Sequence, residues 1–185
     1  MSAQKGPGRL VAVVGPSGVG KDTLIAALAR ARPDFKVAQR IITRGATAGG
    51  EDHLSVSDPL FDAQLAMGRY AFHWHAHGLR YAIPASINAD LAQGRTVVFN
   101  GSRKALDEIR QQYGDMCVLM ITAPPDLLAA RLRARGRESA REIAARLKRA
   151  ALDVPEGAEV IINDGSVDAA LAQILASLSR PTQSA

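Results

Sequence analysis

The chain has 185 residues, a length that suits one compact α/β domain with a sizeable core better than two independent domains. Its net charge is +5, and eighteen of its 23 basic residues are arginines, whose guanidinium groups favour bidentate contacts with phosphate. Because aromatic residues make up only 4% of the chain and no basic tail is present, the composition argues against a nucleic-acid-binding protein.

Targeting and redox signals are sparse. Residues 1–9 lack the apolar core of a signal peptide, and no apolar run approaches the roughly twenty residues of a membrane span. Cys117 is the only cysteine, so an internal disulfide is excluded, and its apolar neighbours predict a buried thiol. We therefore expect a cytoplasmic protein with neither nucleic-acid nor membrane partners, and the sequence leaves a homodimer open.

The first predicted strand, at residues 10–14, and a helical pattern from Thr23 enclose a glycine-rich segment. This segment carries the Gly-x-x-x-x-Gly-Lys pattern of a phosphate-binding loop, in the strand–loop–helix order that such a loop requires. Its N–H groups can turn toward an anion, and Lys21 can reach the transferred phosphate of a nucleotide triphosphate. The expected nucleotide contacts are Gly15, Pro16, Ser17, Gly18, Val19, Gly20, Lys21, Asp22 and Thr23.

One position of this loop departs from the usual pattern. The Ser or Thr that normally follows the lysine and binds magnesium is replaced by Asp22, and Thr23 comes one place later. Either side chain can help to hold the ion, directly or through water. We therefore expect ATP as phosphoryl donor, Mg²⁺ as cofactor, and Asp22 and Thr23 as the metal-binding residues.

The middle third of the chain is predicted to form a small mixed lobe. Its expected elements are an extended segment at 35–43, a glycine-rich loop at 44–51, a helix at 58–67, a strand at 70–77 and a helix at 84–91.

The remaining elements alternate between strand and helix. Buried strands are expected at 96–99, 116–121 and 159–162, and they are followed by helices at 103–113, 125–135 and 167–178. Repeated strand-then-helix order favours a parallel sheet covered on both faces, so the predicted fold class is α/β.

Two arginines at the start of the glycine-rich loop form a candidate acceptor site. Arg40 and Arg44 are close enough in sequence to bind one phosphate, and Glu51 can bind a hydroxyl group or magnesium. The alternative is an exposed pair of arginines near Glu51 and Asp52.

A second arginine-rich region follows residue 130. Arg131 and Arg135 are four residues apart and so share one helix face, and Arg146 lies further along the same region. Mobile cations that close over a triphosphate would spread the charge of the transition state, so Lys21, Arg131, Arg135 and Arg146 are the expected catalytic residues. The alternative is a solvated helical pair, in which Glu138 and Glu142 balance the arginines.

Three histidines alternate along the predicted strand at 70–77. His73, His75 and His77 would project from one strand face, but three ligands on one strand span too far for a tight tetrahedral metal site. We expect pocket lining or hydrogen bonding to sugar hydroxyls instead, and we assign His73 and His77 to the substrate.

Taken together, these residues resemble the guanylate-kinase branch of the P-loop nucleoside monophosphate kinases over nearly the whole chain. The motifs that carry the resemblance are the glycine loop, Ile42-Thr43-Arg44 with Gly50-Glu51, residues 78–81, Arg131-Leu132 with Arg135-Gly136, Arg146-Leu147 and Asn163-Asp164. The resemblance implies a three-layer P-loop kinase fold in one domain, 1–185, with its core at 8–35 and 84–180. It also implies an inserted acceptor-binding lobe near 36–83, in which Arg44 and Tyr81 contact the acceptor phosphate, and a short arginine-rich lid near 131–145.

The chain departs from guanylate kinases where the base is read. The loop at 45–51 lacks their second arginine, and the position of their guanine-reading acid falls near Phe72. These details resemble the ribose 1,5-bisphosphate phosphokinases of phosphonate breakdown, which use ATP to make 5-phospho-α-D-ribose 1-diphosphate. The shared motifs are Gly20-Lys21-Asp22, Thr43-Arg44, residues 49–53, residues 73–84 and Asn100-Gly101-Ser102-Arg103.

Two other functions are weighed against this one. A guanylate kinase would use the same scaffold and would be recognised by its use of GMP. A non-catalytic binding module of the same fold usually loses the phosphate loop, which this sequence keeps.

Overall fold

The computed structural model describes residues 8–44, 53–114, 116–136, 139–141, 143–144, 147 and 154–180. The chain divides into two compact units. The first unit comprises Met1–Val11 and Arg32–Met116, and the second comprises Ala12–Ala31 and Cys117–Ala185. Strand β1 (Leu10–Val14) contributes to both units, and all of its residues are buried, as is typical of a parallel strand that is covered on both faces.

Five strands form one sheet in the order β2-β7-β1-β8-β9. β2 (Lys36–Val37) is parallel to β7 (Val97–Asn100), and β8 (Cys117–Thr122) is parallel to β9 (Glu159–Ile162). The positions of the three strands predicted after residue 95 are therefore confirmed, each within one residue of the expected bounds. The predicted burial holds for β7 and β8 but is wrong for β9, in which only Ile161 is buried because the strand lies at the sheet edge. The predicted α/β class with a central parallel sheet is confirmed as well.

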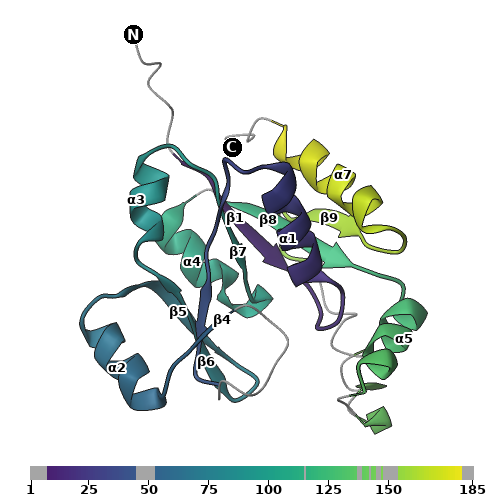
Figure 1. The fold of residues 1–185 in the computed structure, drawn as a ribbon, viewed down its shortest axis with the longest axis horizontal. Helices are drawn as coiled ribbons and strands as arrows, with labels where there is room; N and C mark the ends of the chain where they lie inside the picture. The colour runs from purple at the N-terminus through teal and green to yellow at the C-terminus, as the bar shows by residue number, and fades with distance from the viewer. Residues whose placement is uncertain are drawn as a thin grey trace. The chain divides into compact units, whose positions relative to one another are not determined.

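The second unit holds three of the described helices. They are α1 (Lys21–Ala31), α5 (Pro125–Arg135) and α7 (Val167–Leu178), and α1 packs beside α7 (Figure 1). Helix α7 begins where the Ser166 hydroxyl accepts a hydrogen bond from the Ala169 N–H at 3.2 Å, a standard N-terminal cap. Helix α5 ends at Gly136, whose φ of +62° stops the helix in the left-handed conformation that glycine adopts at little cost.

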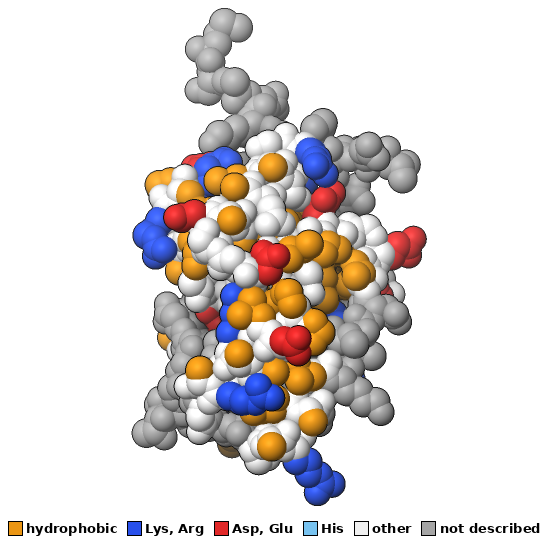
Figure 2. Space-filling model, turned by 90° about the vertical axis from the view of Figure 1, so that its right-hand side faces the viewer, with side chains coloured by type: hydrophobic (Ala, Val, Ile, Leu, Met, Phe, Trp, Pro, Cys, Tyr) orange, Lys and Arg blue, Asp and Glu red, His pale blue; other side chains and the backbone are white. Residues whose placement is uncertain are grey.

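Strand β9 lies at one edge of the sheet and carries exposed apolar side chains. Val160 and Ile162 are 45% and 46% exposed. Figure 2, which looks at the side of the molecule on the right of Figure 1, shows apolar side chains gathered between scattered charged ones.

The first unit contains a second sheet, of four strands in the order β4-β3-β6-β5. These strands are β3 (Arg40–Ile42), β4 (His53–Ser55), β5 (Tyr70–Ala76) and β6 (Leu79–Pro84). The helical elements of this unit are α2 (Asp58–Ala66), α3 (Ile87–Ala92), η1 (Arg103–Ala105) and α4 (Leu106–Tyr113).

The β5–β6 hairpin corrects the predicted secondary structure. The expected helix at 84–91 is wrong at its start, because β6 continues to Pro84 and α3 begins at Ile87. The chain reverses at His77 and Gly78, whose φ values are +54° and +72°, so that residues 79–84 pair with β5. Such a two-residue turn suits the twist of a hairpin. β4 has only three residues, too few to produce a recognisable alternation.

Arg80 fixes helix α2 on one face of this hairpin. Its guanidinium carbon lies 4.1 Å from the ring centroid of the fully buried Phe61, and its Nη2 donates to the Asp62 carboxylate at 2.6 Å. This hydrogen bond lowers the pKa of the Asp62 carboxyl. Phe61 itself packs with Ile41, Tyr70 and Ala82 in a small core of the lobe. The α2 face of the hairpin is therefore occupied by structural contacts.

Candidate nucleotide-binding and acceptor sites

The phosphate-binding loop runs from Gly15, directly after β1, to the start of α1 at Lys21. Gly15 has a φ of +145°, and a Cβ at this position would lie 2.3 Å from the carbonyl oxygen of Ile121 in β8. Gly20 has a φ of +98°, and a Cβ there would lie 2.7 Å from Nδ2 of Asn163. Both positions therefore need glycine for conformation and for space.

Lys21 lies over the loop that precedes it. Its half-buried side chain donates hydrogen bonds from Nζ to the carbonyl oxygens of Gly15 and Pro16, each at 3.0 Å. These contacts hold the ammonium group at the loop, where its charge would face a bound phosphate.

The far end of the loop is held by two side chains from distant parts of the sequence. The carbonyl of Val19 accepts a 2.7 Å hydrogen bond from Nδ2 of Asn163, and Nη1 of Arg131 lies 3.5 Å from the same oxygen. Arg131 also donates to the backbone carbonyl of Asn163 at 3.0 Å. Because a trans peptide directs its C=O and the next N–H in opposite directions, fixing the Val19 carbonyl fixes the direction of the Gly20 N–H.

Asn163 holds the loop in position, a role that no sequence pattern predicted. It is 5% exposed, and its own N–H donates to the Thr122 carbonyl at 2.8 Å, so β8 fixes its backbone. The signal in the sequence is its place directly after the last predicted strand, because the carboxyl ends of parallel strands line the ligand crevice of open α/β sheets.

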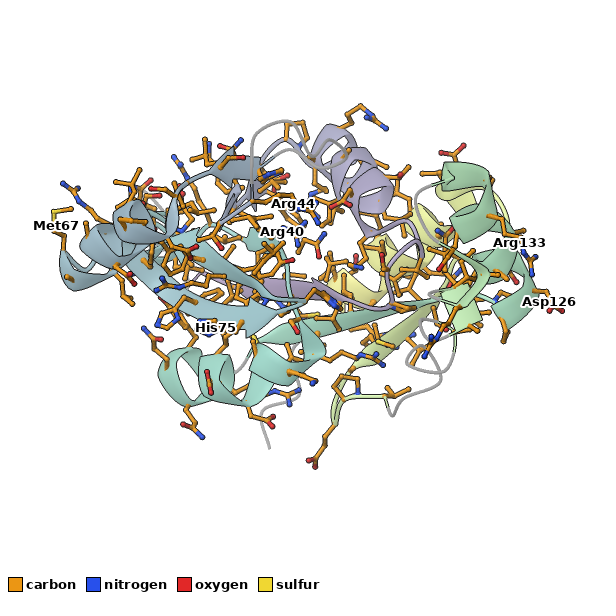
Figure 3. The ribbon with its side chains drawn as sticks, turned by 90° about the horizontal axis from the view of Figure 1, so that it is seen from below. Arg40, Arg44, Met67, His75, Asp126 and Arg133 are labelled. Carbon is orange, nitrogen blue, oxygen red and sulfur yellow. The ribbon has the colours of Figure 1, made fainter. Side chains whose placement is uncertain are left out.

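The other predicted donor-side cations are only partly covered by the described residues. Arg146 and the side chain of Arg135 lie outside them. Arg133 and Asp126 of α5 are exposed and point outward (Figure 3), which suits the solvated role that the alternation of charges predicted for part of this region.

Asp22 and Thr23 lie in the first turn of α1, and both are exposed. Carboxylate and hydroxyl oxygens are hard ligands of the kind that Mg²⁺ prefers, and magnesium usually takes only one or two protein ligands beside substrate phosphates and water. The donor set therefore fits this ion. Among the residues described, no group of three or more His, Cys, Asp or Glu side chains gathers in a way that could hold a metal by itself.

The predicted acceptor residues Arg40, Arg44 and Tyr81 belong to the first unit. Arg40 begins β3 and is only 9% exposed, and its guanidinium carbon lies 6.0 Å from the ring centroid of Tyr81. The half-buried Arg44 follows the other end of β3 (Figure 3). Thr43 fixes this end, because it exchanges two 3.0 Å hydrogen bonds with the backbone of Arg80 in β6. Glu51 lies outside the described residues.

The histidines do not join this group. Tyr81 stacks on Trp74 with 5.4 Å between ring centroids. His73, which directly precedes Trp74 in β5, instead faces Phe61 of α2, with 6.3 Å between ring centroids. Neighbouring residues of a strand project to opposite faces, so His73 and Tyr81 lie on opposite faces of the hairpin. The expectation of three histidines on one strand face is wrong for His77, because β5 ends at Ala76 and His77 is an exposed turn residue.

The sequence resemblance places the guanine-reading acid of guanylate kinases near Phe72. Phe72 is 7% exposed and packs against Phe99 and Tyr113, at centroid distances of 5.0 and 5.5 Å. Phe72 thus places an apolar side chain, packed on aromatic rings, where an acid would be needed to read a purine.

The family of this chain follows from comparison with known proteins. The family model described as guanylate kinase matches residues 7–180. The chain belongs to the guanylate kinase family. A crystal structure of guanylate kinase from Anaplasma phagocytophilum has the same fold, with a TM-score of 0.69 at 18% identity over 96% of this chain and 89% of that one. The expected P-loop kinase fold is thereby confirmed.

Within this family, similar relatives share a more specific name. Ribose 1,5-bisphosphate phosphokinase PhnN of Ruegeria sp. is 46% identical over 176 residues, which cover 93% of this chain and 91% of the relative. The protein of the same name from Bradyrhizobium diazoefficiens is 48% identical, over 88% of this chain and 84% of its own. The resemblance to these phosphokinases that the sequence motifs indicated is confirmed.

Within the described part of the chain, helices that combine the length and the apolar character needed to cross a membrane are absent.

Proposed function

We propose that this guanylate kinase family member transfers the terminal phosphoryl group of ATP to ribose 1,5-bisphosphate, which gives 5-phospho-α-D-ribose 1-diphosphate and ADP. The observation that carries the proposal is the 46–48% identity to relatives named for this reaction, over most of the chain. The apolar surroundings of Phe72 support it, because they suit an acceptor without a base to be read.

Catalysis requires only that the two substrates be positioned and that the charge of the transferred phosphoryl group be stabilised. The acceptor is an ionised phosphate oxygen, which is already a nucleophile, so no base is needed. Lys21 and the loop N–H groups bind the phosphates, and Arg131, Arg135 and Arg146 neutralise charge in the transition state. Asn163 is a positioning residue, because its hydrogen bond to the Val19 carbonyl sets the loop direction.

On the acceptor side, Arg40, Arg44 and Tyr81 bind the phosphate that receives the new phosphoryl group. The position of the Arg40 guanidinium beside the Tyr81 ring supports a shared role for these two residues. Glu51, His73 and His77 stay predicted substrate residues. The opposite-face position of His73 makes it the weakest member of the set.

We further propose that residues 1–185 act as one guanylate-kinase-like domain in the cytoplasm, on small-molecule substrates alone. A homodimer stays a prediction, and the exposed Val160 and Ile162 on the edge strand β9 support it.

Magnesium would be held beside the phosphates by Asp22, with Thr23 as the neighbouring oxygen donor. Asp22→Asn should raise the Mg²⁺ concentration needed for half-maximal activity by about 10-fold or more, because the amide has lost the negative charge that attracts the ion. Asp168→Asn is the matched control, since Asp168 is also an exposed first-turn aspartate of a helix in the second unit. An unchanged magnesium titration for Asp22→Asn would transfer the role to Thr23 or Glu51.

The proposed reaction is tested by offering the enzyme ATP with ribose 1,5-bisphosphate, GMP or AMP in a coupled ADP-release assay. Ribose 1,5-bisphosphate should have a kcat/KM far above that of GMP. Arg44→Ala should lower this kcat/KM by about 10- to 100-fold, because a half-buried arginine loses a partly desolvated charge contact. Arg30→Ala, which removes an exposed arginine from the last turn of α1, is the control. Efficient use of GMP with no use of ribose 1,5-bisphosphate would replace the proposal by a guanylate kinase.

A further inference from the structure

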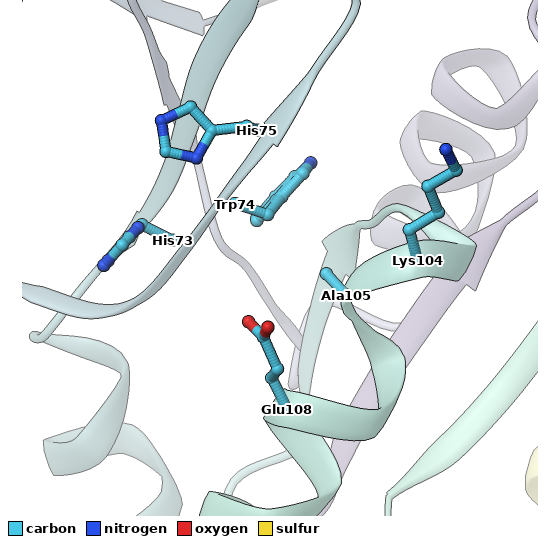
Figure 4. A pocket seen from close by; sticks show the side chains of 6 residues that line it. All are labelled: His73, Trp74, His75, Lys104, Ala105 and Glu108. Atoms are coloured by element: carbon cyan, nitrogen blue, oxygen red, sulfur yellow. The ribbon is translucent and has the colours of Figure 1, made fainter.

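A pocket in the first unit contains charged residues that the proposed mechanism does not use. Its volume is about 340 Å³, and it lies between β5 and the start of α4. The residues that line it are His73, Trp74, His75, Lys104, Ala105 and Glu108 (Figure 4). This volume falls within the range of small-molecule sites, which begins at about 300 Å³.

The pocket adjoins the proposed acceptor-phosphate residues through stacked rings. Trp74 lines the pocket and lies parallel to Tyr81, with an interplanar angle of 7°, and Tyr81 in turn faces the guanidinium group of Arg40. A ligand whose phosphate is bound at Arg40 and Tyr81 would therefore place its remaining atoms near Trp74. All of these residues belong to the first unit, so the pocket and the acceptor-phosphate residues can be described together.

The charges in the pocket are of two kinds. Glu108, from the first turn of α4, directs its carboxylate toward Trp74 and His73, whereas the Lys104 ammonium points away from Glu108 (Figure 4). Both side chains are exposed, so each can exchange water for a ligand group. Ala105 lies between them in sequence and also lines the pocket. Its side chain is a single methyl group, so it takes up little of the pocket's space.

These features match the part of ribose 1,5-bisphosphate that does not react. Beyond its 1-phosphate the molecule has a furanose ring with two hydroxyl groups, which donate hydrogen bonds, and a 5-phosphate, which is an anion. A carboxylate accepts hydrogen bonds from sugar hydroxyls, and an ammonium group binds a phosphate.

Resting on the proposed function, we propose that this pocket binds the ribose ring and the 5-phosphate of the acceptor. Glu108 accepts hydrogen bonds from the ring hydroxyls, and Lys104 pairs with the 5-phosphate. The pocket thereby selects sugar bisphosphates over sugar monophosphates, and its two charged residues determine specificity without taking part in phosphoryl transfer.

The experiment compares two acceptors, ribose 1,5-bisphosphate and ribose 1-phosphate, which lacks the group that Lys104 binds. Lys104→Ala should lower kcat/KM for the bisphosphate by about 10-fold or more and for the monophosphate by less than about twofold. Glu108→Gln should lower kcat/KM for both acceptors to a similar extent, because both keep the ring hydroxyls. Neither change should alter the KM for ATP or the melting temperature, because both side chains are exposed.

Two control variants remove the same charges elsewhere in the first unit. Lys36→Ala removes an exposed lysine from β2. Asp107→Asn removes the charge of Asp107, which precedes Glu108 and has a side chain that is 90% exposed. Both controls should keep wild-type values for both acceptors.

The possible results distinguish a wrong pocket assignment from a wrong proposed reaction. Equal losses on both acceptors for Lys104→Ala, or wild-type kinetics for either pocket variant, would overturn the pocket assignment while the proposed reaction stands. Wild-type enzyme that phosphorylates GMP and leaves ribose 1,5-bisphosphate unchanged would overturn the proposed reaction, and the pocket assignment with it.

Discussion

Lys21→Ala is expected to lower kcat by about 100- to 1,000-fold or more, with little change in the melting temperature. The ammonium group is held at the loop by the carbonyl oxygens of Gly15 and Pro16, so its charge is already in place before the phosphates bind. A positive charge that is already in position stabilises the negative charge that develops in the transition state. Its removal should therefore lower kcat as well as kcat/KM.

The folded state should lose little, because the side chain of Lys21 is only half-buried and water can replace it at the two carbonyl oxygens. The measurement is kcat at saturating ATP, paired with thermal melting, and Lys36→Ala serves as a control for the removal of a lysine. A Lys21→Ala enzyme with near-normal kcat would show that this loop is not the catalytic phosphate site.

Gly15→Ala is expected to destabilise the protein by about 3–5 kcal/mol, the sum of an unfavourable backbone conformation and a forced displacement in a packed core. The added Cβ would lie 2.3 Å from the Ile121 carbonyl oxygen, which belongs to the buried strand β8 and cannot move as a flexible side chain would. The φ of +145° adds strain for any residue with a Cβ.

Urea unfolding measures this loss of stability, and calorimetric titration with ADP measures the accompanying loss of nucleotide binding. Gly165→Ala is the matched control, because a Cβ at Gly165 would meet nothing within 4 Å. That variant should stay within about 1 kcal/mol of the wild type. Equal stability of the two variants would mean that the approach of Gly15 to β8 does not restrict the loop.

Helix α5 contacts the phosphate loop, and this contact changes the interpretation of Arg131. Sequence spacing predicted a cation that contacts phosphates, and the structure places its guanidinium group on the carbonyl oxygens of Asn163 and Val19. Leu132, the next residue, would be 2.8 Å from a Cβ at Gly18, so α5 also packs closely on the loop. Arg131 thus supports the loop geometry in this structure, and its contact with the transferred phosphate stays a prediction.

Features that depend on neighbouring residues could be predicted from the amino-acid sequence. The glycine pattern of the phosphate loop, the buried runs of β1, β7 and β8, and the helices after them depend on the conformation and periodicity of neighbouring residues. Motif spacing also indicated the family. It indicated the departure at Phe72 as well, because that depends on which residue type occupies a position in a strand.

Contacts between side chains that are distant in the sequence could be found only in the three-dimensional structure. Arg131 and Asn163 reach the Val19 carbonyl from 112 and 144 residues further along the chain, and no local pattern encodes such a meeting. The hairpin register, set by the turn at His77 and Gly78, decided that Trp74 faces Tyr81 while His73 faces α2. The pocket with Lys104 and Glu108 likewise forms only where β5 meets α4. Residue type and periodicity specify an element and its faces, whereas pairing and packing between elements specify which faces come together.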